Sequence, residues 1–185
     1  FSRWNGTAWS TPSGVTNDFL LDGAPQVAWT GDGNAVAVWQ RLNDTLTITA
    51  TWDMTTANKI EIATASYDSA GGIWSPVSLL TNNGSLDMTP QLARNGDGKL
   101  LAVWRQNDGG LLSGDATQPD RIMAAFYDGA WGTPVAAVAA IPGLVDLAAG
   151  YGSNAATIAY TRYLTPTGSP TPTLQLFTSA WNGAS

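Results

Sequence analysis

The chain contains no cysteine and no histidine among its 185 residues. Disulfides, thiolate or histidine-ligated metal sites, and Ser-His-Asp or Cys-His catalysis are therefore excluded. No run of apolar residues approaches the roughly 18 that a membrane helix needs, and no signal peptide is recognisable. The sequence therefore predicts no membrane span, and we expect no cofactor and no metal site.

Charge is also scarce, because only 12% of the residues are charged and the net charge is −6. An acidic chain cannot neutralise a phosphate backbone, which excludes nucleic acid as a partner. Glu61 is the only glutamate, and the other acids are aspartates, which suit turns better than helix surfaces. The composition is typical of an all-β protein with a neutral polar surface.

Internal repetition is the strongest signal in the sequence. Residues 21–28 (LDGAPQVA) recur as residues 86–93 (LDMTPQLA), and a weaker third copy opens at Val145. Each copy continues through a glycine turn into an apolar strand that ends in an aromatic residue and an arginine. An alternating strand, a tight turn and a Trp-containing segment then follow, at residues 59–77, 121–135 and, in part, 174–181.

The turns and strands of each copy indicate hairpins within a covered sheet. Asp32-Gly33 and Asp97-Gly98 lie between apolar strands, and such pairs predict tight turns in which both central residues have positive φ. Residues 35–39 and 100–104 are apolar on both faces, so we expect neighbouring sheets to cover them on both sides.

A four-stranded unit that recurs about every sixty residues predicts an all-β fold, a β-propeller segment of three four-stranded blades with out-of-register ends. The repeats span about 22–83, 87–140 and 146–185, the last completed by a strand equivalent to 9–15. A β-sandwich is the alternative, but it gives no reason for this repeat. Three blades cannot close a ring, so we expect half of a six-bladed ring in a homo-oligomer, or a piece of a larger propeller completed by the remainder of a longer chain.

The motif Pro25-Gln26-Val27-Ala28, with the turns and Trp segments that follow it, resembles propeller repeats of large secreted bacterial proteins. Residues 66–74 (SYDSAGGIW) are also distantly similar to the sialidase-type Asp box, Ser-x-Asp-x-Gly-x-x-Trp, with one extra residue. Residues 126–131 depart further and lack the serine. The resemblance implies a propeller and an extracellular or cell-surface location. It implies no activity, because Asp boxes are structural turns.

Two recurring residue sets fall at the end of the blades that carries the long, dissimilar connections 42–58, 106–120 and 163–173. They form either a polar mouth for a carbohydrate or other hydroxylated ligand, or turn caps and ion pairs between blades. Recurrence in every repeat favours the structural role. These residues are Asp22, Asp87 and Asp146 at the start of the innermost strand, and Arg41, Arg105 and Arg162 after the second strand.

Tryptophans and glycine turns give further candidates. Trp52 lies in the first connection without a counterpart elsewhere, so it is the best single candidate for ligand contact. We expect Trp9, Trp74 and Trp131 to pack between blades. Residues 31–34 and 95–98 carry oxygen donors suited to calcium but too few acids, and we interpret them as hairpin turns.

The function predicted from the sequence is a non-catalytic extracellular module that binds a glycan or a protein through its long connections, or that serves as a scaffold. The alternative is a sialidase-like glycoside hydrolase or lyase that uses an Asp pair at the same end. Alternation places Glu61 inside a strand, away from that mouth. The arginine cluster and tyrosine nucleophile of sialidases have no assigned counterparts here.

Overall fold

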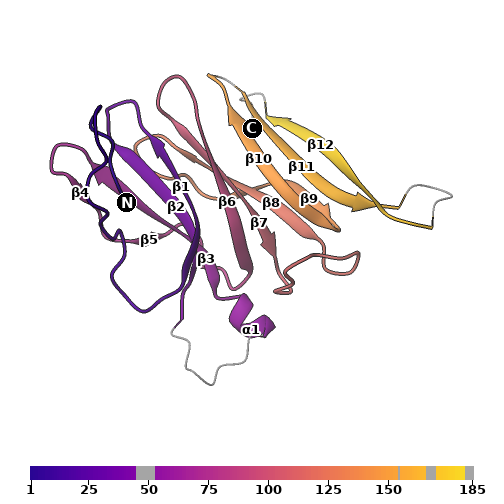
Figure 1. Ribbon diagram of the computed structural model, residues 1–185. Coiled ribbons are helices and arrows are strands. Elements are labelled where there is room, and N and C mark those ends of the chain that lie inside the picture. Colours follow the sequence, from indigo (N-terminus) through magenta and orange to yellow (C-terminus); the bar gives the residue numbers. More distant parts are fainter. Residues whose placement is uncertain (45–52, 154, 166–169, 182–185) are drawn as a thin grey trace.

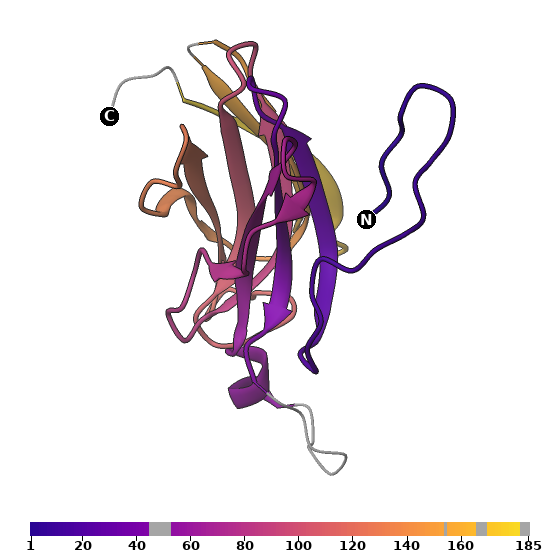
Figure 2. The ribbon, with the colours of Figure 1, turned by 90° about the vertical axis from the view of Figure 1, so that its left-hand side faces the viewer.

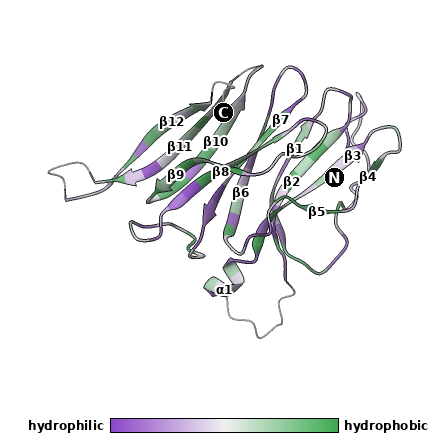
Figure 3. Ribbon diagram, turned by 180° about the vertical axis from the view of Figure 1, so that it is seen from behind, coloured by the Kyte–Doolittle hydropathy of each residue, from purple (hydrophilic) through white to green (hydrophobic). Residues whose placement is uncertain are grey.

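Three antiparallel sheets lie side by side in the computed structural model, which describes residues 1–44, 53–153, 155–165 and 170–181 (Figure 1). Hydrophobic residues are distributed along the strands of all three sheets (Figure 3). The expected all-β fold, a propeller segment of three blades, is confirmed. The single described helix, α1 (Met54–Ala57), is one turn long, and no helix of the described residues is long and apolar enough to cross a membrane.

Each sheet is one blade, and its strands follow the chain from the innermost strand outward. Blade 1 comprises β1 (Asp22–Trp29), β2 (Ala35–Leu42), β3 (Ile60–Asp68) and a fourth strand broken into β4 (Ile73–Trp74) and β5 (Ser78–Leu79). Blade 2 comprises β6 (Leu86–Arg94), β7 (Leu100–Asn107), β8 (Asp120–Tyr127) and β9 (Val135–Ile141). Blade 3 comprises β10 (Leu144–Tyr151), β11 (Ala156–Leu164) and β12 (Thr173–Trp181).

The blades stack through apolar seams, and the innermost strands β1, β6 and β10 are neighbours. Val38 and Ile62 of blade 1 pack against Trp104 of blade 2 in the first seam. In the second seam, Ile122 of blade 2 packs with Ile158 of blade 3. All eight residues of β7 are buried, because blade 2 is covered on both sides. The apolar second strands of the sequence thus have the burial on both faces that was expected.

The strand registers define equivalent positions in the blades. Trp39 lies opposite Ala63 in blade 1, and Trp104 lies opposite Met123 in blade 2, each five residues into its strand. Arg41 follows Trp39 by two residues, but Arg105 follows Trp104 by only one. The predicted equivalence of Arg41 and Arg105 is therefore wrong by one position, and because side chains alternate between faces, the two arginines point to opposite sides of their blades.

The hairpin turns follow the predicted positions but not the predicted geometry. Only the glycines have positive φ, 84° at Gly33 and 82° at Gly98, and the preceding aspartates do not. Gly98 is required for a second reason. A Cβ atom there would lie 2.1 Å from the backbone nitrogen of Gly31, because the turns of blades 1 and 2 meet backbone to backbone.

The N-terminal segment forms an isolated hairpin beside blade 1 (Figure 2). Trp4 pairs with Trp9 as Tyr67 pairs with Trp74, and the Ser10 N–H donates to the Arg3 carbonyl at 2.8 Å. The corresponding bonds Ser75 to Ser66 and Gly132 to Phe126 are also 2.8 Å long. The segment thus reproduces the outer hairpin of a blade, at the face of blade 1 that a preceding blade would cover.

Candidate functional site

The second strands β2, β7 and β11 run toward the same end of the blades, where α1 also lies (Figure 1). The side chain of Asp53 caps α1 by accepting from the Thr56 N–H at 2.8 Å. Gly110 of the second connection approaches this helix so closely that a Cβ atom would lie 2.8 Å from the Met54 carbonyl oxygen. Residues 45–52, including the predicted ligand contact Trp52, lie outside the described residues.

Asp22 serves its own blade. Its Oδ1 accepts from the indole N–H of Trp39 at 2.7 Å and lies 3.2 Å from the guanidinium of Arg41. Arg41 is 5% exposed and also pairs with Asp18, whose pKa is held below its usual range by the Leu20 N–H and by Arg41. These contacts tie the start of β1 to the end of β2.

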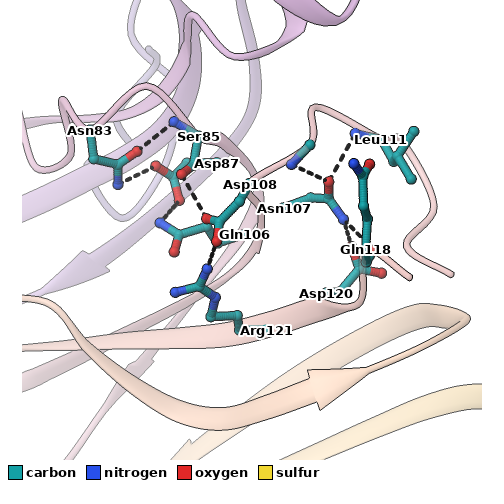
Figure 4. Close-up of polar contacts among 11 residues, drawn as sticks. Asn83, Ser85, Asp87, Gln106, Asn107, Asp108, Leu111, Gln118, Asp120 and Arg121 are labelled. Atoms are coloured by element: carbon teal, nitrogen blue, oxygen red, sulfur yellow. Dashed lines mark hydrogen bonds and ion pairs between the residues drawn. The ribbon is translucent and has the colours of Figure 1, made fainter. Parts of the chain in front are cut away.

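Asp87 has the corresponding position in blade 2 and is fully buried. Its Oδ1 accepts from the Trp104 indole N–H at 2.7 Å and from the Gln106 amide at 2.9 Å. Its Oδ2 accepts from the Asn83 side-chain amide at 3.0 Å. The carboxylate therefore joins the second strand of blade 2 to the connection that leads from blade 1 (Figure 4).

Burial raises the pKa of Asp87 to about 6, and the nearby negative charge of Glu61 acts in the same direction. Glu61 is 2% exposed, and its Oε1 accepts from the Asn83 backbone N–H at 3.2 Å. Its Oε2 has no hydrogen-bond partner among the described residues. The sequence interpretation put Glu61 away from this end, but both carboxylates hold Asn83, so the lone glutamate belongs to the same cluster as Asp87.

The aspartate and the arginine of the third repeat do not contact one another. Asp146 is exposed and accepts from the Leu147 N–H at 2.9 Å, and the Arg162 guanidinium lies 4.8 Å from the centre of the Phe177 ring. Neither contact joins them to one another. The three aspartates and three arginines are thus spread over three blades in different environments, and the geometry gives no single mouth lined by all six.

The connection of blade 2 is ordered by buried polar groups. Asn107, 1% exposed, accepts from the backbone N–H groups of Gly109 and Leu111, each at 3.0 Å. Its amide donates to Asp120 Oδ1 at 3.1 Å, and Asp120, also buried, forms a 2.8 Å ion pair with Arg105. Groups that lie on this connection are therefore held in place by hydrogen bonds and an ion pair within the protein.

A groove of about 450 Å³ runs between blades 1 and 2 at this end. It lies where the chain leaves β5 of blade 1 and runs toward β6 of blade 2. Asn83 and Asp108 are exposed at its sides, and Arg121, which pairs with Asp108, is half-buried. Ser85 donates to Asp108 at 2.9 Å. Its polar lining is Thr81, Asn82, Asn83, Ser85, Gln106, Asp108 and Arg121, and its apolar lining is Leu80, Met123 and Pro134.

Of the three tryptophans predicted to pack between blades, one, Trp131, lies in a seam between the described blades. Trp131 packs in the first seam and donates from Nε1 to Thr64 Oγ1 of blade 1 at 3.1 Å. Trp74 packs on the open face of blade 1, where the Phe1 ring contacts it with centroids 5.7 Å apart. Trp9 is 67% exposed and contacts Trp4.

The turns considered for calcium have local hydrogen bonds. Asp32 accepts from the Thr30 hydroxyl and the Asn34 N–H, which lower its pKa. Asn95 accepts from the Asp97 and Lys99 N–H groups. In the part of the chain that the structure describes, no group of three or more acidic residues is placed to hold a metal ion.

Sequence reasoning missed Asn83, Gln106, Asp108 and Arg121. None of the four recurs at the same place in every repeat, so a search for repeated residues passes over them. The signal that could have found them is the reverse of repetition: amides and a charge pair that interrupt the pattern next to the recurring Asp87.

Comparisons with known proteins agree with the fold. No family model matches the chain, and no curated protein matches it. Among solved structures, the Hadza microbial sialidase Hz136 is similar, with a TM-score of 0.55 and 14% sequence identity over 85% of this chain. The match covers 35% of that sialidase's chain. At this identity, the similarity shows a sialidase-like β-propeller arrangement of the blades and does not extend to activity.

Proposed function

We propose that this protein is a non-catalytic extracellular module that binds a glycan in the groove between blades 1 and 2. The observation that carries the proposal is the lining of that groove. Asn83, Ser85 and the Asp108–Arg121 pair supply both donors and acceptors, while Met123 and Pro134 supply apolar surface. Sugars need this combination, because their hydroxyl groups donate and accept and their ring faces are apolar.

The groove also supports a ligand without net charge. Its two charged side chains neutralise one another, and its remaining polar groups are amides and hydroxyls. Asp87 and Glu61 act from behind the surface, where they fix Asn83 through its side-chain and backbone N–H groups. A preorganised amide loses little conformational entropy when it binds a hydroxyl group.

A glycan array probed with the purified chain, followed by calorimetry on the best oligosaccharide, tests the proposal. Asp108→Ala removes a groove acceptor and should weaken binding about tenfold, because one hydrogen bond to a charged group contributes about 1.5 kcal/mol or more. Asp128→Ala is the matched control, since it breaks an exposed ion pair with Lys99 at the other end of blade 2 and should leave affinity unchanged.

Absence of binding to every glycan class, or equal losses in the two variants, would refute the proposal. Binding of a protein ligand that Asp108→Ala weakens, without glycan binding, would also refute it.

The competing proposal is a glycoside hydrolase or lyase, and the raised pKa of Asp87 beside Glu61 favours it, since a general acid needs such a shift. Burial opposes it, because Asp87 is fully buried and both its oxygens accept hydrogen bonds within the protein. Turnover of fluorogenic aryl glycosides that Asp87→Asn abolishes would establish the enzyme and exclude a purely binding role.

A further inference from the structure

The side of blade 3 that faces away from blade 2 is exposed and apolar. The strand registers give Leu176 the position that Ile62 has in blade 1 and Ile122 has in blade 2. Both isoleucines are fully buried in seams, whereas Leu176 is 69% exposed. Leu174 and Tyr163, which pair on the same face, are 51% and 53% exposed. This face has the character of a seam without the blade that would cover it.

The outermost strand of blade 3 is also an unprotected edge. β12 (TLQLFTSAW) carries no charged residue and no proline, and among the described residues it pairs only with β11. Edge strands of monomeric proteins are usually blunted by charge, proline or a bulge. An edge with none of these features fits a strand that is paired in the functional assembly.

The opposite end of the stack exposes the complementary face. Val27 and Trp29 on blade 1 are 66% and 51% exposed, while Leu92, which has the position of Val27 in blade 2, packs into the first seam. Residues 1–15 cover only the outer part of this face. A cavity of about 720 Å³ remains between that segment and β1, lined mainly by aromatic and aliphatic groups together with Ser2, Arg3 and Gln26.

An unpaired donor marks the same face. The buried Nε1 of Trp74 has no hydrogen-bond partner among the described residues, whereas Nε1 of its counterpart Trp131 donates to Thr64 across the first seam. The registers give Thr178 of blade 3 the position of Thr64. The outward face of blade 3 therefore carries the acceptor that Trp74 lacks.

We propose that the outward face of blade 3 binds the open face of blade 1 of a second copy of this chain, and that two such contacts close a six-bladed ring. The two faces are mainly apolar, although Arg3 lies at the face of blade 1 and Asp146 at the face of blade 3. The two faces are related to one another as the two sides of each internal seam are. Six blades lie within the range of closed propellers. This inference is independent of the proposed glycan binding.

Ring closure requires an exchange at the N-terminal hairpin. Trp4 and Trp181 have the same position in their hairpin and strand, so both cannot occupy one blade. We expect residues 1–4 to give way to the end of the partner's β12. Ser13 has the position of Ser78, which pairs with Thr64, so Ser13 would then pair with the partner's Thr178 and add the fourth strand.

Size-exclusion chromatography with light scattering over a dilution series tests the proposal. The wild type should show twice the 19.3 kDa mass of the chain. Leu176→Asp on blade 3 and Val27→Asp on blade 1 should each reduce the mass to that of one chain, because each places a charge in the seam. Leu112→Asp, at a leucine 54% exposed in the connection of blade 2, is the control and should leave the dimer intact.

Mixing the two monomeric variants gives the sharper result. One intact blade 3 face then meets one intact blade 1 face, so a dimer should return, although only one seam can form. A wild type that is monomeric throughout the series would overturn the proposal, as would larger polymers. A Val27→Asp variant that stays dimeric would also overturn it, because it would indicate that two copies of β12 pair with each other.

Discussion

A carboxylate at the start of the innermost strand serves as an acceptor for tryptophan in blades 1 and 2. Asp22 and Asp87 each accept an indole N–H at 2.7 Å, from Trp39 and Trp104. Asp22 is balanced by Arg41, but the corresponding residue in blade 2 is the neutral Gln106. Asp87 therefore has no countercharge from this position, and its burial raises its pKa.

Asp87 makes stability depend on pH with an unusual sign. Its pKa is about 6 in the folded state and 3.8 in the unfolded state, so between these values the folded chain binds the extra proton. The free energy of unfolding contributed by this group is therefore highest below about pH 4. It should fall by on the order of 3 kcal/mol as the pH rises to about 7.

Asp87→Asn removes this dependence and keeps the acceptor for Trp104 and Gln106. Urea unfolding at several pH values gives the free energy of unfolding of the variant and of the wild type. The difference between the two cancels the pH-dependent contributions of the acids whose pKa is lowered, because both proteins contain them. The variant should gain stability relative to the wild type between about pH 4 and 7. A constant difference over that range would show that Asp87 does not titrate there.

Thr64 joins two blades through one hydroxyl group, which donates to the Ala37 carbonyl at 2.9 Å and accepts from Trp131. Thr64→Val should lower the free energy of unfolding by about 1–3 kcal/mol, because two buried polar groups lose their partner while the volume is kept. Thr133→Val, at an exposed position, should change it by less than about 0.5 kcal/mol. Chemical unfolding of both variants makes the comparison, and equal effects would contradict the role of Thr64.

The turns between the first two strands of blades 1 and 2 depend on glycine for two separable reasons. Gly98→Ala would add a Cβ atom that meets Gly31 at 2.1 Å and would strain a φ of 82°, whereas Gly129, with φ of 76°, faces open space. Gly129→Ala should therefore cost about 1 kcal/mol and Gly98→Ala about 3 kcal/mol or more. Thermal unfolding distinguishes them, and similar losses would show that the turns do not meet.

The strands and turns of this chain could be predicted because each element occurs in several copies along the sequence. The fourfold unit, the glycine turns and the twice-covered second strands were all predicted. The groove was not, since its residues break the repeat. The shift between Arg41 and Arg105 was also missed, because a residue match in sequence does not fix the face of a strand, and one position changes the face.

The protection of backbone amide hydrogens from exchange with solvent should differ between the three blades. Every residue of β7 is buried, whereas β12 has none that is buried. Hydrogen exchange measured by mass spectrometry on dilute protein should show slowest exchange in β7 and fastest in β12, because local opening is easiest where few apolar contacts break. Uniform protection of all three blades would contradict this gradient.

The seams have a consequence for how such a chain changes in length. Each blade offers the next one the same kind of surface, and blade 2 is joined to blade 3 by only Pro142 and Gly143. Duplication of one whole unit in the gene would therefore add a module whose two sides both meet matching neighbours. A partial duplication would leave a mismatched side, so length variation in this architecture is expected in whole units.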